Sequence, residues 1–177
     1  KIALPNELRH GNQPRFQYVL GQLYQLQGDK KAARHAYEKV LKLQPDSEMD
    51  FNTRLQLAQL EASPMAAVTL LTKMAKQDKN KDRLDQIYGT LGDILLAQGD
   101  TTKALEYYAK GIEGSTKNGM SKATVLITAG DIYYQQRDYV SASPCYKEAS
   151  QILTVQHEDY KRIQRRSEPL DALVVDY

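Results

Sequence analysis

The sequence predicts an all-α fold, in which four helical hairpins stack into a right-handed superhelix and a final helix caps the C-terminal end. The first observation is a repeating pattern, or frame, in which one position recurs at steps of 34, 37 and 38 residues. The residues at this position are Gly21, Leu55, Gly92 and Gly130, and three of the four are small. The second is a residue able to cap a helix, which recurs in one frame at Asp29, Ser63, Asp100 and Asp138. A period of this length is typical of solenoids built from helical repeats.

The two helices of each predicted hairpin carry different residues of the frame. The first helix carries the small residue, and the second carries an alanine followed four positions later by a bulky side chain. These alanines are Ala33, Ala67, Ala104 and Ala142, and the bulky residues are Tyr37, Leu71, Tyr108 and Tyr146. The small residues let paired helices approach closely, and each bulky side chain fills the gap toward the next hairpin. We expect helices near 14–27, 30–43, 49–61, 64–76, 82–97, 101–113, 119–135 and 139–154.

The repeats divide the chain into six predicted segments. Residues 1–13 are expected to be the end of a truncated upstream helix or a linker. The hairpins are expected at 14–47, 48–81, 85–118 and 123–154. Residues 155–177 are expected to form the capping helix, in which apolar side chains cover the end of the stack. Those side chains are Ile163, Leu170, Leu173 and Val174.

The overall composition gives no sign of a nucleic-acid or membrane partner. The 177 residues are 41% hydrophobic and 26% charged, with a formal net charge of +2. A nucleic-acid-binding domain usually carries a basic excess, and a membrane span needs about 20 apolar residues. We therefore expect no nucleic acid and no direct membrane insertion. Cys145 is the single cysteine, which excludes an internal disulfide and fits the cytoplasm and the periplasm equally.

No arrangement of residues predicts catalysis, a cofactor or a metal ion. His10, His35 and His157 do not share helical spacing, and none has a cysteine or carboxylate at a metal-ligand spacing on a shared face except by accident. Cys145 lies on a packing helix, where a buried small side chain is favoured over a nucleophile. We therefore expect a protein that is not an enzyme.

Four basic residues share one face of the predicted capping helix: Lys161, Arg162, Arg165 and Arg166. One interpretation is that they contact an anion or a nucleic acid. The favoured interpretation is a solvated face that pairs with Glu158 and Asp159 through ion pairs along the helix.

The first helices of stacked hairpins line a concave groove, and we predict that this groove binds protein. The groove positions are Arg15, Tyr18, Gln22, Gln25, Asn52, Gln56, Gln59, Asp93, Asp131 and Tyr134. This polar surface suits an extended peptide or the surface of a protein, although solvated positions without a partner remain the alternative. Tyr18 and Tyr134 are expected to be anchors, because the repeat does not need their rings for packing.

The recurring frame resembles the tetratricopeptide repeat. The first copy contains Leu20-Gly21, Tyr24, Gly28-Asp29, Ala33, Tyr37 and Pro45, with Gln17 where the pattern prefers tryptophan. The resemblance covers about residues 14–154 and implies a non-catalytic scaffold that binds other proteins or peptides. Some members of this family hold the C-terminal carboxylate of chaperones through lysine and asparagine in the groove. No lysine occupies the corresponding positions here, which disfavours that function.

Residues 18–28, 46–54 and 79–92 also resemble the tetratricopeptide lipoproteins of gliding motility and type IX secretion in Bacteroidota. This narrower resemblance implies an assembly factor of the cell envelope that faces the periplasm, is lipid-anchored upstream of Lys1, and links components of the secretion machine. The alternatives are a cytoplasmic protein and a regulatory module of a larger enzyme or signalling protein. Neither alternative fixes the oligomeric state.

Overall fold

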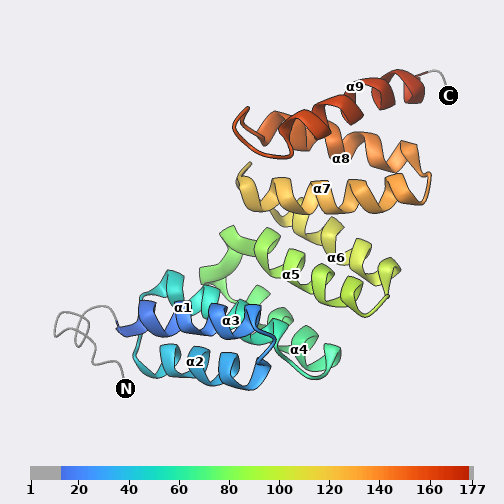
Figure 1. Cartoon of the computed structure of the whole chain (residues 1–177). Helices are drawn as coiled ribbons and strands as arrows, with labels where there is room; N and C mark the ends of the chain where they lie inside the picture. The colour runs from blue at the N-terminus through green and yellow to red at the C-terminus, as the bar shows by residue number, and fades with distance from the viewer. Residues whose placement is uncertain (1–12, 176–177) are drawn as a thin grey trace. The chain divides into compact units, whose positions relative to one another are not determined.

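The computed structural model describes residues 13–175, and every regular element in that range is helical (Figure 1). The elements are α1 (Gln13–Leu26), α2 (Lys30–Lys42), α3 (Ser47–Gln59), α4 (Pro64–Ala75), the 3-10 helix η2 (Asp78–Arg83), α5 (Leu84–Ala97), α6 (Thr101–Gly114), α7 (Met120–Gln135), α8 (Tyr139–Ile152) and α9 (Tyr160–Val175). The predicted all-α fold is confirmed, and the predicted helix ends agree to within one helical turn. The expectation for residues 1–12 lies outside the described part of the chain.

The described chain forms two compact units that divide between Ala67 and Val68, so the boundary between them falls inside α4. In the first unit α1 packs on α2, and α2 packs on α3. In the second unit α5 pairs with α6 and α7 with α8, while α9 lies along α8 (Figure 1). None of the described helices is both long and apolar enough to cross a membrane.

Aspartates cap the second helix of three hairpins, as predicted. The side chains of Asp29, Asp100 and Asp138 each accept a hydrogen bond from the backbone N–H three residues later, at 2.9, 3.1 and 3.1 Å. Ser63 stands at the fourth copy of this position, directly before α4. Asp46 caps α3 in the same way, at 2.8 Å, although the frame does not predict it. A cap of this kind contributes about 1 kcal/mol.

The residue before each of the three aspartate caps adopts a left-handed backbone conformation. Gly28 and Gly99 have φ values of 79° and 81°, whereas Arg137 has a φ of 62°. Glycine has no Cβ atom and adopts this conformation without steric cost, but a larger residue does not. The turn before α8 is therefore the strained copy of this turn.

The ring of each frame tyrosine packs on the small residue of its own hairpin. Tyr37, Tyr108 and Tyr146 are fully buried. A Cβ atom on Gly92 would overlap the ring of Tyr108, while a Cβ atom on Gly130 would stand 3.0 Å from the ring of Tyr146. The rings therefore fill the space inside a hairpin, which refines the expectation that they fill the gap toward the next hairpin.

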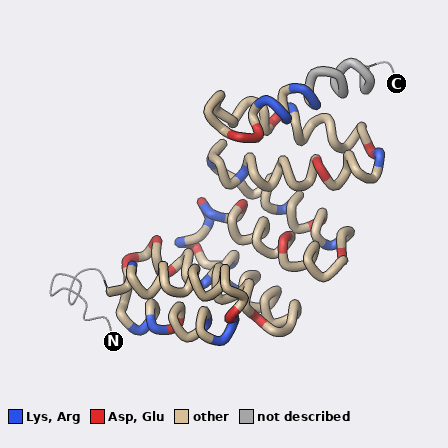
Figure 2. The backbone as a smooth tube through the Cα atoms, viewed as in Figure 1, with Lys and Arg blue, Asp and Glu red and all other residues tan. Residues whose placement is uncertain are grey.

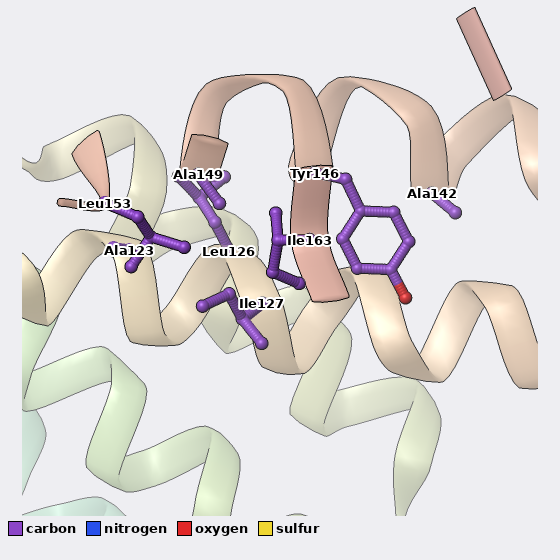
Figure 3. Packing of buried hydrophobic residues seen from close by; sticks show 8 residues of the cluster. All are labelled: Ala123, Leu126, Ile127, Ala142, Tyr146, Ala149, Leu153 and Ile163. Atoms are coloured by element: carbon purple, nitrogen blue, oxygen red, sulfur yellow. The ribbon is translucent and has the colours of Figure 1, made fainter. Parts of the chain in front are cut away.

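The helix α9 closes the core at the C-terminal end of the second unit. Figure 3 shows this cluster, in which Ile163 of α9 meets side chains of α7 and α8. Its buried members are Ala123, Leu126, Ile127, Ala142, Tyr146, Ala149, Leu153 and Ile163. The burial of Ile163 supports the capping prediction, whereas the side chains of Leu170, Leu173 and Val174 lie outside the described part.

Candidate protein-binding surface

Seven predicted groove residues lie in the first unit, on α1 and α3. Arg15, Tyr18 and Asn52 line a hollow of about 280 Å³, together with Asp46, Glu48 and Met49. Gln22, Gln25 and Gln56 line a second hollow of about 420 Å³, together with Val19, Leu23 and Leu26. Gln59 lies beside them, because its side-chain oxygen is 3.4 Å from Nε2 of Gln25. We call this surface of α1 and α3, with its two hollows, the α1/α3 face.

Two groove side chains on α1 also serve the packing of the first hairpin. The ring of Tyr18 is half-buried, and its centroid lies 5.6 Å from that of Tyr37. Burial raises the pKa of Tyr18, and a hydrogen bond with Gln56 partly offsets this increase. The hydroxyl of Tyr37 donates to Oε1 of Gln25 at 3.0 Å. The ring of Tyr18 is therefore less free than the sequence suggested, while its edge still lines a hollow.

An apolar stripe on α1 was not predicted from the sequence. It consists of Phe16, Val19, Leu23 and Leu26, whose exposed fractions are 40%, 51%, 50% and 85%. Residues at this spacing share one face of a helix, so the spacing itself was the available signal. Three members of the stripe line the larger hollow beside the glutamines. The α1/α3 face therefore combines exposed apolar surface with side-chain amides.

In the second unit, the groove residue Asp131 on α7 is held by two arginines of α9. Oδ1 of Asp131 accepts from the Tyr146 hydroxyl at 2.6 Å and from Nη1 of Arg166 at 2.6 Å. Nη1 of Arg162 lies 2.8 Å from both carboxylate oxygens, and Arg162 also pairs with Asp159 at 2.7 Å. The basic residues in the first half of α9 (Figure 2) therefore include two that hold the helix in place.

Tyr134, the second predicted anchor, is also engaged within the protein. The guanidinium of Arg166 stacks 4.6 Å from the centroid of the Tyr134 ring. The ring also meets Tyr139 and Tyr146 edge-on, at centroid distances of 5.4 and 6.3 Å. Because 36% of Tyr134 stays exposed, the ring remains at the surface but is not the free anchor that the sequence suggested.

Asp93 on α5 repeats part of this arrangement. The hydroxyl of Tyr108 donates to Oδ1 of Asp93 at 2.7 Å. Partial burial raises the pKa of the Asp93 carboxyl group, and the hydrogen bond from Tyr108 partly offsets this increase. The Asp93 side chain is nevertheless exposed, and no arginine or lysine pairs with it among the side chains that the structure describes. Sequence reasoning did not find the tyrosine–aspartate pairs, because their partners come from different helices.

Two kinds of chemical site can be tested on the described residues, a reactive cysteine and a metal site. Burial raises the pKa of the Cys145 thiol to about 11, so the reactive thiolate is scarce at neutral pH. Within residues 13–175, no group of three or more His, Cys, Asp or Glu side chains is arranged to hold a metal ion.

Comparison with known proteins identifies repeats at the first, third and fourth predicted hairpins. Models of the tetratricopeptide repeat match residues 14–47 and 83–154. BBSome complex member BBS4 of Bos taurus is 32% identical over 139 residues, which are 78% of this chain and 24% of that protein. The chain thus spans about a quarter of the length of this relative. The crystal structure of BtubC (BKLC) from P. vanneervenii superimposes with a TM-score of 0.67 at 20% identity, over 97% of this chain and 76% of that one, so the two share a fold.

Proposed function

We propose that this chain, which contains tetratricopeptide repeats, is a non-catalytic scaffold that binds another protein through the α1/α3 face. Repeats of this kind serve as protein-interaction modules, and BBS4 is by name a member of a complex. The observation that carries the proposal is the stripe of exposed apolar side chains beside a row of amides. Leu23 and Leu26 leave half or more of their surface in water, and contiguous exposed apolar surface is typical of interaction sites.

The chemistry of the α1/α3 face suits a peptide or protein partner with mixed polarity. Burial of Val19 and Leu23 supplies about 25 cal/mol per Å² of apolar area removed from water. Gln22 and Gln56 each offer one acceptor and two donors, so they can pair with a backbone and fix its direction. Arg15 and Glu48 flank the smaller hollow and provide the polar rim that such interfaces usually have.

Capture experiments with matched variants test this proposal. Leu23→Glu places a charge in the stripe, and Val140→Glu places the same charge on another exposed helical residue, which is 62% exposed. We expect wild type and Val140→Glu to capture the same proteins from the source cell, and Leu23→Glu to lose them. The expected loss is at least tenfold in captured amount, with an unchanged helical circular dichroism spectrum. If all three chains capture the same proteins in equal amounts, the partner does not bind the α1/α3 face.

We further propose that the scaffold works in the cell envelope, as an assembly factor of a secretion or gliding machine. The support is the resemblance of residues 18–28, 46–54 and 79–92 to the tetratricopeptide lipoproteins of Bacteroidota. The full-length reading frame and cell fractionation test this role. We expect a lipid-accepting cysteine upstream of Lys1 and recovery of the protein with the membranes. A catalytic domain in the same reading frame would favour the regulatory-module alternative instead.

A further inference from the structure

The buried residues of α7 and α9 indicate that α7 packs on the third hairpin (α5/α6) in the register in which α9 packs on the fourth hairpin (α7/α8). Val125 of α7 is buried with Ala104 and Tyr108. Ile163 of α9 is buried in the same way, with Ala142 and Tyr146. Val125 and Ile163 therefore occupy equivalent positions in two successive layers of the second unit.

This register predicts which residues of α7 lie nearest to Asp93. The arginines that hold Asp131 lie one residue before and three residues after Ile163. The residues at the same offsets from Val125 are Thr124 and Thr128. Both threonine hydroxyls donate to carbonyls of their own helix, at 3.0 Å each. The third hairpin thus keeps the tyrosine–aspartate pair, but its neighbouring helix supplies no cation.

We propose that Asp93, held by Tyr108, is a binding site for an arginine of a partner protein, which takes the place that Arg166 takes at Asp131. The proposal rests on the scaffold function above and names the chemistry of one partner contact. The fourth hairpin shows that a carboxylate in this frame accepts guanidinium donors while it holds the tyrosine hydroxyl. Asp93 is exposed, so an incoming side chain can reach it.

The geometry favours arginine over lysine. The Tyr108 hydroxyl already donates to Oδ1 of Asp93. Oδ2 and the remaining lone pairs can still accept hydrogen bonds, which favours a ligand that carries several donors. A guanidinium presents five donors in a planar fork, whereas an ammonium group is a compact charge that holds its water more strongly. Leu96 stands in the frame position of Tyr134, so an aliphatic side chain replaces the ring on which Arg166 stacks. Tyr108 acts here as a positioning residue.

A titration with a short peptide tests this site without any partner protein. The probe is the blocked peptide Ac-Ala-Arg-Ala-Ala-Ala-Arg-Ala-NH2, whose arginine spacing copies that of Arg162 and Arg166, with a lysine version as its control. Backbone amide NMR shifts of the whole chain report binding. We expect saturable shifts of the amides around Asp93 and Thr128, with a dissociation constant in the millimolar range or lower. The lysine peptide should bind at least threefold more weakly.

Three variants locate the contact. Asp93→Asn should weaken binding of the arginine peptide at least fivefold. Glu106→Gln removes the same charge from an exposed position on α6 and should leave this binding unchanged. In Thr128→Arg the new arginine should pair with Asp93 and so prevent binding of the peptide. Equal affinity of wild type and Asp93→Asn, equal affinity for the lysine peptide, or loss of binding in Asp131→Asn alone would overturn the proposal. Because this assay does not involve the α1/α3 face, its failure is distinguishable from a failure of the capture experiment.

Discussion

In the third hairpin (α5/α6) and in the fourth (α7/α8), a buried tyrosine packs on a glycine and donates its hydroxyl to the aspartate after that glycine. The two bonds are nearly equal, 2.7 Å at Asp93 and 2.6 Å at Asp131. The hairpins differ in three respects: the space over the glycine, the charge opposite the aspartate, and the residue in the left-handed turn. The third and fourth hairpins thus share the tyrosine–aspartate pair, whereas the first hairpin pairs Tyr37 with Gln25 instead. The next helix supplies two arginines to Asp131, while Asp93 is left for a ligand in the site proposed above.

The largest difference between the hairpins is expected from alanine at the frame glycines. In Gly92→Ala the new Cβ atom overlaps the buried Tyr108 ring, and overpacking of this kind costs about 1–3 kcal/mol. In Gly130→Ala the contact to Tyr146 is 3.0 Å, which a small shift of the ring accommodates. The higher helix propensity of alanine returns up to about 1 kcal/mol in both variants, so it cancels in the comparison. We expect Gly92→Ala to lose about 2 kcal/mol more stability than Gly130→Ala in urea unfolding. Equal losses would show that the two rings have equal room.

The second difference concerns removal of the aspartate charge. Asp131→Asn weakens the bonds to both arginines of α9, and we expect this to destabilise the docking of α9 by about 1–2 kcal/mol, since the pairs are partly exposed. Asp93→Asn should change stability by less than about 0.5 kcal/mol, because the amide oxygen still accepts from Tyr108 and no cation is lost. Hydrogen exchange of the α9 amides measures the first effect, and chemical unfolding measures the second. A larger loss in Asp93→Asn would contradict the comparison.

An arginine added to α7 should give the third hairpin the ion pair that the fourth hairpin has. Thr128→Arg gives α7 the residue that α9 carries at Arg166, and a partly exposed pair with Asp93 should add about 0.5–1 kcal/mol of stability. In an Asp93→Asn background the gain should vanish, and this double-mutant cycle isolates the pair. If the gain persists without the Asp93 charge, the arginine stabilises α7 by another route, and the two helices do not share a register.

Local patterns in the sequence were sufficient to predict most of the fold. The three aspartate caps and the glycine–tyrosine frame repeat at fixed offsets, so each copy supports the others. The contacts at the surface were harder to predict than the fold, because they depend on which helix packs beside which. The pairing of Arg162 with Asp159 follows from helical spacing, and it was predicted. The pairing of Arg162 and Arg166 with Asp131 spans more than 30 residues, and it needs the knowledge that α9 takes the position of a repeat helix.

The smallest expected difference is in the turn that precedes each aspartate cap. Arg137 adopts a φ of 62° where the third hairpin has Gly99 at 81°, and this conformation costs a residue with a Cβ atom roughly 1–2 kcal/mol. Arg137→Gly removes that strain but adds conformational freedom to the unfolded chain, which offsets about 0.5–1 kcal/mol of the gain in stability. We therefore expect Arg137→Gly to stabilise the chain by roughly 0.5 kcal/mol in urea unfolding. The reciprocal change Gly99→Arg should destabilise it by a similar or slightly larger amount, since Asp100 holds the turn in place through its bond to the Lys103 amide. A destabilised Arg137→Gly would mean that the arginine side chain makes a contact worth more than the backbone strain.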